Sequence, residues 1–118
     1  MKKNILKEKT FQFSLEIFKT AKYLMDVKKE FIISRQLLRS GTSIGANVEE
    51  SQEVLTKKEF IYKLTIALRE AKETHYWLRL LNALEKESTT YTSLLQSCEE
   101  IIKILNSIII TTKKRYLS

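Results

Sequence analysis

Residues 58–81 read KEFIYKLTIALREAKETHYWLRLL and carry two heptad patterns on opposite sides of one predicted helix. The first pattern places apolar or small residues at alternating intervals of four and three, a spacing that aligns them along one side of an α-helix. This seam consists of Phe60, Leu64, Ala67, Ala71, Thr74, Leu78 and Leu81. The segment therefore predicts a long helix that packs along one side.

The second pattern lies on the opposite side and combines cations with tyrosines. Its members are Lys58, Tyr62, Thr65, Arg69, Lys72, Tyr76 and Arg79. Lysine and arginine neutralise phosphates, and tyrosine rings offer surfaces on which bases stack. The candidate nucleic-acid-binding residues, called the basic face below, are Lys58, Tyr62, Arg69, Lys72, Tyr76 and Arg79. A solvated face of the same composition would need no ligand, so the pattern alone does not choose between the two interpretations.

A third series, between the seam and the basic face, holds more apolar residues than one seam requires. Exposed apolar surface often marks an interface, and tryptophan is enriched at interface centres. The candidate oligomer interface, called the flank below, consists of Ile66, Glu70, Glu73, Trp77 and Leu80. Coverage by a neighbouring helix of the same chain explains this series equally well.

Length and composition favour one helical domain. The chain has 118 residues, no proline and two glycines, so it lacks the usual residues of tight turns. Its net charge of +7 suits an acidic partner such as nucleic acid.

A single cysteine, Cys98, fits a reducing cytoplasm. Apolar runs no longer than three residues, as at Ile108–Ile110, predict no membrane span, and the first ten residues do not resemble a secretory signal.

Four amphipathic helices are predicted, at about residues 10–28, 30–53, 57–86 and 89–115. In the first helix, one apolar stripe holds Phe11, Leu15, Phe18 and Met25, and a second stripe beside it holds Ile17, Ala21 and Leu24. The inward candidates of the second helix are Phe31, Ser34, Leu38, Gly41, Ile44, Gly45 and Val48. Short linkers between such helices favour an all-α, antiparallel up-down four-helix bundle.

Local signals support these boundaries. Thr56 and Glu59 form a capping box at the start of the third helix. Two glycines, Gly41 and Gly45, share one face of the second helix, so we expect a continuous helix that approaches its neighbour closely there. The last turn of the fourth helix carries the cations that the negative end of a helix dipole prefers. The inward residues predicted for this helix are Tyr91, Leu94, Leu95, Cys98, Ile101, Ile102, Leu105, Ile108 and Ile109.

The residues that carry chemistry are few. The only histidine, His75, lies beside apolar positions of the third helix and is expected to be half-buried and hydrogen-bonded. A di-metal bundle needs two histidines, so we predict no metal site, and no nucleophile and base pair is evident at a motif spacing. Cys98 is expected to be a packed core thiol. The sequence predicts no catalytic residue and no cofactor.

The segment 36–50, QLLRSGTSIGANVEE, resembles the motif Q-L-x-R-A-x-x-S-I-x-x-N-I-x-E-G of a small bacterial family. Its members are the four-helix-bundle proteins encoded in intervening sequences of 23S ribosomal RNA genes. The resemblance continues at Lys58-Glu59-Phe60 and through residues 64–74, and covers nearly the whole chain. Ser40 stands where alanine is usual in the motif, and Ser51 replaces a common glycine.

The resemblance implies a bundle that assembles as a homo-oligomer, typically a five-membered ring. It also implies structural roles for residues that match the motif, namely Arg39, Ser43, Ile44, Asn47 and Glu50. A related protein, the accessory variability protein of diversity-generating retroelements, binds nucleic acid and a reverse transcriptase. The resemblance thus adds a reverse transcriptase to the partners implied for this chain.

The sequence therefore favours a non-enzymatic, basic, oligomeric bundle that acts as a nucleic-acid-binding accessory factor, with RNA or DNA as its ligand. The alternative is a protein-interaction or assembly module without a nucleic-acid ligand, in which the positive charge only maintains solubility.

Overall fold

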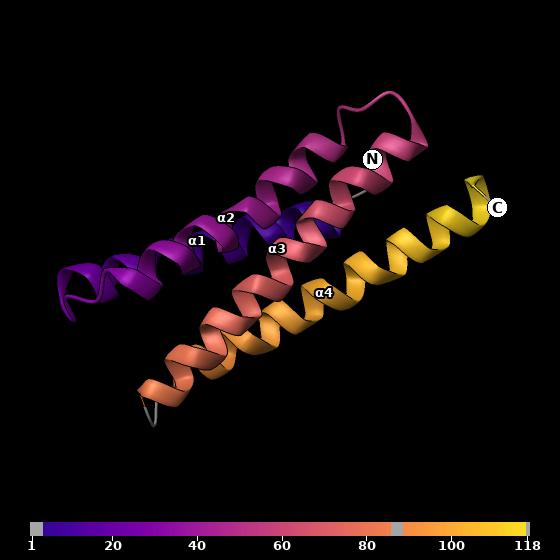
Figure 1. The fold of residues 1–118 in the computed structure, drawn as a ribbon. Helices are drawn as coiled ribbons and strands as arrows, with labels where there is room; N and C mark the ends of the chain where they lie inside the picture. The colour runs from indigo at the N-terminus through magenta and orange to yellow at the C-terminus, as the bar shows by residue number, and fades with distance from the viewer. Residues whose placement is uncertain (1–3, 86–88, 118) are drawn as a thin grey trace.

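The computed structural model describes residues 4–85 and 89–117, and this part of the chain forms four α-helices and no strand (Figure 1). The helices are α1 (Ile5–Asp26), α2 (Ile32–Ser51), α3 (Lys57–Leu84) and α4 (Thr89–Tyr116). The prediction of an all-α fold with four helices is confirmed. Residue 86, the predicted end of the third helix, lies outside the described residues.

Each helix packs against the next one along the chain (Figure 1). In addition, α4 contacts α1. The α1–α4 interface is the smallest of these four interfaces. Along α3 and α4, the Cys98 thiol donates to the Ala71 carbonyl at 3.2 Å, while the Lys57 ammonium lies 4.7 Å from the centroid of the Tyr116 ring. The start of α3 therefore lies beside the end of α4.

The core contains the seam predicted on α3. Six of its seven residues are buried, and Phe60 is half-buried and packs against the core. Each fully buried leucine or isoleucine contributes about 1.5–3 kcal/mol to folding. The largest such aliphatic residues are Ile17, Leu24, Leu37, Ile44, Leu64, Leu78, Leu81, Ile101 and Leu105. They come from all four helices, so one core joins the described part of the chain.

The residues predicted to face inward on α4 do so. Tyr91, Leu94, Cys98, Ile101, Leu105 and Ile109 are buried, and Leu95, Ile102 and Ile108 are half-buried against the core. Lys113, Lys114 and Arg115 occupy its last turn as predicted. None of the four helices, as far as residues 4–85 and 89–117 show, is long and apolar enough to cross a membrane.

Caps explain where α1 and α3 begin. The Thr56 side-chain oxygen accepts a hydrogen bond from the Glu59 amide at 3.1 Å, which confirms this half of the predicted capping box, and the Glu59 carboxylate accepts from the Thr56 hydroxyl at 3.3 Å. The Asn4 side chain accepts from the Lys7 amide at 3.0 Å, so α1 begins at Ile5 and not near Thr10 as predicted. Asn4 is itself held by Gln52, whose side-chain oxygen accepts from Asn4 at 2.9 Å.

Glu30 caps α2, which begins at Ile32 and not at residue 30 as predicted. Its carboxylate accepts hydrogen bonds from the amides of Ile32 and Ile33 at 3.0 Å and of Ser34 at 2.7 Å. A negative charge is favourable at this positive end of a helix. Burial raises the pKa of Glu30, but the hydrogen bonds from the backbone amides outweigh burial and leave the pKa below its usual value.

The two glycines of α2 bring this helix close to α1, as predicted, and the helix continues through both. A Cβ atom at Gly41 would lie 2.7 Å from Cγ2 of Ile17. A Cβ atom at Gly45 would lie 3.1 Å from Oγ of Ser14 and 3.2 Å from the Thr10 carbonyl oxygen. The missing side chains therefore provide the space in which the two helices meet.

Two predicted apolar faces are correct only in part. Phe11, Leu15 and Phe18 of α1 are 60%, 42% and 52% exposed, because the second stripe, together with Phe13, faces the core instead. Apolar residues cover more of α1 than its neighbours can bury. On α2, the predicted inward residues Ser34, Gly41, Ile44, Gly45 and Val48 are buried. Leu37 is fully buried in place of Leu38, which is half-buried, and Phe31 precedes the helix and is exposed.

Candidate nucleic-acid interface

The basic face lies on the side of α3 that is turned away from the core. Since the seam faces inward, residues half a turn away point outward. All six residues of the basic face are exposed, while Thr65, between them in sequence, is half-buried and donates to the Ile61 carbonyl at 2.7 Å. The structure therefore places the candidate residues on one accessible surface.

No carboxylate in the described part of the chain neutralises the cations of the basic face. Within residues 4–85 and 89–117, Lys58, Arg69, Lys72 and Arg79 form no ion pair. The neighbouring carboxylates of Glu70 and Glu73 are paired with Arg39 of α2 instead. The arrangement leaves positive charge facing solvent along α3.

Two carboxylates of the flank are paired with α2. The Arg39 guanidinium forms ion pairs with Glu70, at 3.3 Å, and with Glu73. The Trp77 indole N–H also donates to Glu73, at 2.9 Å. Ile66, Trp77 and Leu80 are half-buried, so α2 covers part of the flank and leaves part of it accessible.

The residues of the 36–50 motif stabilise α2 and its contact with α3. Ser43 donates to the Arg39 carbonyl at 2.7 Å, and Asn47 donates to the Ser43 carbonyl at 2.9 Å. Ile44 is fully buried, and Glu50 pairs with Lys63 of α3 at 2.7 Å. These contacts join successive turns of α2 and connect α2 to α3.

The two departures from the motif both lie at buried positions. The hydroxyls of Ser40 and Thr74 are 2.8 Å apart and hydrogen-bonded. The Ser51 hydroxyl donates to the Val48 carbonyl at 2.6 Å and accepts from the Gln52 side chain at 3.0 Å. Because Gln52 also holds Asn4, Ser51 connects the end of α2 to the start of α1.

The single histidine and the single cysteine have the surroundings that the sequence predicts. His75 is half-buried, and its Nε2 atom lies 2.8 Å from the Glu99 carboxylate on α4. Cys98 is fully buried, and burial raises the pKa of its thiol to about 12. In the described part of the chain, no group of three or more His, Cys, Asp or Glu side chains is placed to hold a metal ion.

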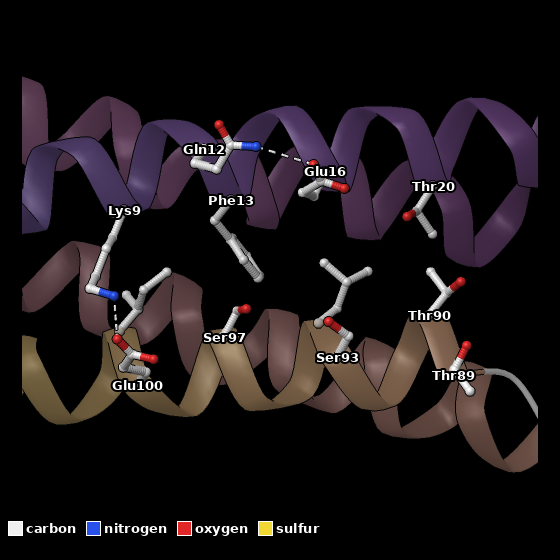
Figure 2. Close-up of a pocket in the computed structure, with 12 residues that line it drawn as sticks. Lys9, Gln12, Phe13, Glu16, Thr20, Thr89, Thr90, Ser93, Ser97 and Glu100 are labelled. Carbon is white, nitrogen blue, oxygen red and sulfur yellow. Dashed lines mark hydrogen bonds and ion pairs between the residues drawn. The ribbon is translucent and has the colours of Figure 1, made fainter.

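A groove between α1 and α4 is the site that sequence reasoning missed (Figure 2). Its volume is about 550 Å³, and Phe13, Leu94 and Ile101 give it an apolar lining. Lys9 and Glu100 pair at one end of the groove, as Figure 2 shows. The polar residues around it are Gln12, Glu16, Thr20, Thr89, Thr90, Ser93 and Ser97. The sequence shows polar residues spaced three and four apart on both helices, and this spacing could have indicated the groove. Only the packing of α1 against α4 brings the two series together.

Comparison with known proteins agrees with this fold. The model of the family described as 23S rRNA-intervening sequence protein matches residues 2–107. A crystal structure of a protein of unknown function from the S23 ribosomal protein family of Bacteroides thetaiotaomicron has a TM-score of 0.86 and 45% sequence identity, over 89% of this chain and 98% of that one. Comparison with curated proteins gave no match. The chain therefore belongs to the family of 23S rRNA-intervening sequence proteins.

Proposed function

We propose that this protein is a non-enzymatic accessory factor that binds nucleic acid through the basic face of α3. The observation that carries the proposal is the separation of charge on this helix. Glu70 and Glu73 are paired with Arg39, whereas Lys58, Arg69 and Lys72 are exposed and form no ion pair within residues 4–85 and 89–117. Unpaired cations can bind phosphates without first breaking an internal ion pair.

The dimensions of the basic face suit a nucleic-acid backbone. From Lys58 to Arg79 the helix advances roughly 31 Å at 1.5 Å per residue, enough to follow several phosphates. In an oligomer the same face would be repeated, and simultaneous contacts would raise the overall affinity without any new kind of contact.

The experiment is a salt series with a labelled single-stranded RNA and a single-stranded DNA of the same sequence. Arg69→Glu with Lys72→Glu should weaken binding at least tenfold. If each residue contacts one phosphate, the logarithmic salt slope should also become shallower by about 1.4, because each single-strand contact contributes about 0.7. Helical circular dichroism should stay unchanged, because both side chains are exposed.

The matched control is Lys19→Glu with Lys103→Glu, which makes the same change in net charge at exposed positions of α1 and α4. We expect the control to lose much less affinity than the variant of the basic face. Equal losses for the two variants would contradict the proposal, since they would indicate a general effect of charge. A parent protein that binds neither RNA nor DNA would also refute it.

A second function is favoured by the exposed apolar stripe of α1. Phe11, Leu15 and Phe18 lie on one side of the helix and are each at least 42% exposed. Contiguous apolar surface of this kind is typical of protein-interaction sites. We propose a protein-interaction or assembly module as the alternative if nucleic acid does not bind.

We also propose that the helices form an antiparallel, up-down bundle that assembles as a homo-oligomer, with a five-membered ring as the expected state. Contacts such as Ala71 with Cys98 and Lys57 with Tyr116 support the antiparallel course of α3 and α4. The partly accessible flank around Ile66, Trp77 and Leu80 supports self-association.

A further inference from the structure

Tyr76 has a more defined environment than the other tyrosine of the basic face. Its ring meets the Trp77 ring edge-on, with 5.1 Å between centroids and 72° between planes. The Arg79 guanidinium carbon lies 5.7 Å from the centroid of the same ring. Tyr76 is nevertheless 49% exposed. Tyr62, at 64% exposure, has no ring contact within the described part of the chain.

Trp77 is held by a hydrogen bond at its indole N–H and by packing of its ring. Its indole N–H donates to the Glu73 carboxylate at 2.9 Å, and its ring packs against the core. Glu73 is in turn paired with Arg39 of α2. Arg39 also forms an ion pair with Glu70 at 3.3 Å. A chain of contacts therefore runs from α2 through Arg39, Glu73 and Trp77 to the Tyr76 ring.

This arrangement fixes an aromatic surface before any ligand binds. An aromatic side chain that is already ordered loses less conformational entropy on binding than a free one. Tyrosine rings and arginine guanidinium planes are both surfaces on which unpaired bases stack. The bases of a duplex are stacked on one another and do not offer such a face to a side chain.

We propose that Tyr76 and Arg79, called the stacking corner below, bind one unpaired base and give the basic face a preference for single-stranded over double-stranded nucleic acid. Arg39 is a positioning residue, which acts on the corner through Glu73 and Trp77. The inference rests on the proposed function, since it names the class of nucleic acid that this face takes. Phosphates next to the stacked base lie within reach of Lys72, one turn before Tyr76 on the same face.

The experiment compares affinities for three probes of about 12 nucleotides, a length within the usual site sizes of single-strand-binding proteins. The probes are a single strand, tested as RNA and as DNA, the duplex of the same sequence, and an abasic strand with the same number of phosphates. The parent should bind the single strand more tightly than the other two. Tyr76→Ala should lose about tenfold for the single strand and little for the duplex or the abasic strand. Tyr76→Phe should keep the parental preference because it keeps the ring.

Two further variants separate stacking from other effects. Tyr23→Ala removes a tyrosine of α1 that is 50% exposed, and it should bind all probes as the parent does. Arg39→Gln should reduce single-strand affinity more than duplex affinity, although Arg39 lies outside the basic face. Trp77 is the only tryptophan, so its fluorescence should change when the single strand binds and change less with the abasic strand.

The possible results are distinct. Equal losses of Tyr76→Ala for all three probes, or no loss for the single strand, would overturn the stacking corner while leaving nucleic-acid binding by the basic face intact. A parent that binds no probe would overturn the proposed function and this inference together. An unchanged single-strand preference in Arg39→Gln would remove the positioning role alone.

Discussion

The hydroxyls of Ser40 on α2 and Thr74 on α3 form a hydrogen bond of 2.8 Å, and both residues are fully buried. Thr74 also donates to the Glu70 carbonyl at 2.7 Å. Ser40 occupies a position where the family motif usually has alanine. The polar departure on one helix is therefore matched by a hydroxyl on the facing helix.

This pair predicts an asymmetric response to substitution. Ser40→Ala should lower the free energy of unfolding by only about 1 kcal/mol, because Thr74 still bonds to the Glu70 carbonyl. Thr74→Val should cost about 1–3 kcal/mol, because it leaves the Ser40 hydroxyl buried without its partner. Urea unfolding measures both, and the double variant should cost less than the sum of the two. Strict additivity would show that the hydroxyls are not coupled.

Gly41→Ala should destabilise the protein although alanine is the better helix former. The gain in helix propensity is about 1 kcal/mol, but the new Cβ atom would lie 2.7 Å from Cγ2 of the buried Ile17. Overpacking a core typically costs about 1–3 kcal/mol, so we expect a net loss in thermal or urea unfolding. In the Ile17→Ala background the loss should shrink or reverse. A stabilised Gly41→Ala variant would contradict the close approach of α1 and α2.

Glu30→Gln should weaken the cap of α2 in a pH-dependent way. The folded state lowers the pKa of Glu30, so its stabilisation is present above the unfolded value near 4.5 and is lost as pH falls through the folded pKa. At pH 7 the variant should lose about 1 kcal/mol of unfolding free energy, and below the folded pKa it should match the parent. Glu53→Gln, at an exposed position, should lie within about 0.5 kcal/mol of the parent at pH 7.

Light scattering should report a mass about five times the 13.9 kDa of one chain at tens of micromolar protein. If the flank forms the interface, Trp77→Ala should weaken assembly by roughly 2 kcal/mol or more. Phe11→Ser with Phe18→Ser should leave the mass unchanged. If Phe11→Ser with Phe18→Ser lowers the mass and Trp77→Ala does not, the interface lies on the apolar stripe of α1. A mass of one chain for the parent would refute self-association.

The sequence by itself determined the helices and the two sides of α3. Heptad spacing fixes which residues share a face, and this local geometry holds whatever the neighbours are. The buried seam, the Thr56 cap and the exposed basic face were therefore predictable, and the glycines at 41 and 45 indicated a close approach without identifying α1 as the neighbour. Family membership was also readable from the 36–50 motif, because the motif is a property of the chain itself.

Only the tertiary structure decided which of two apolar stripes on α1 is buried. Phe11 and Ile17 are both apolar and both fit a helical period, and the choice depends on how many neighbours the helix has and on which side they lie. The same reason applies to the Ser40–Thr74 bond, the contacts from Arg39 through Glu73 to Trp77, and the groove between α1 and α4. Each joins residues from different helices, so its geometry exists only after the helices have packed.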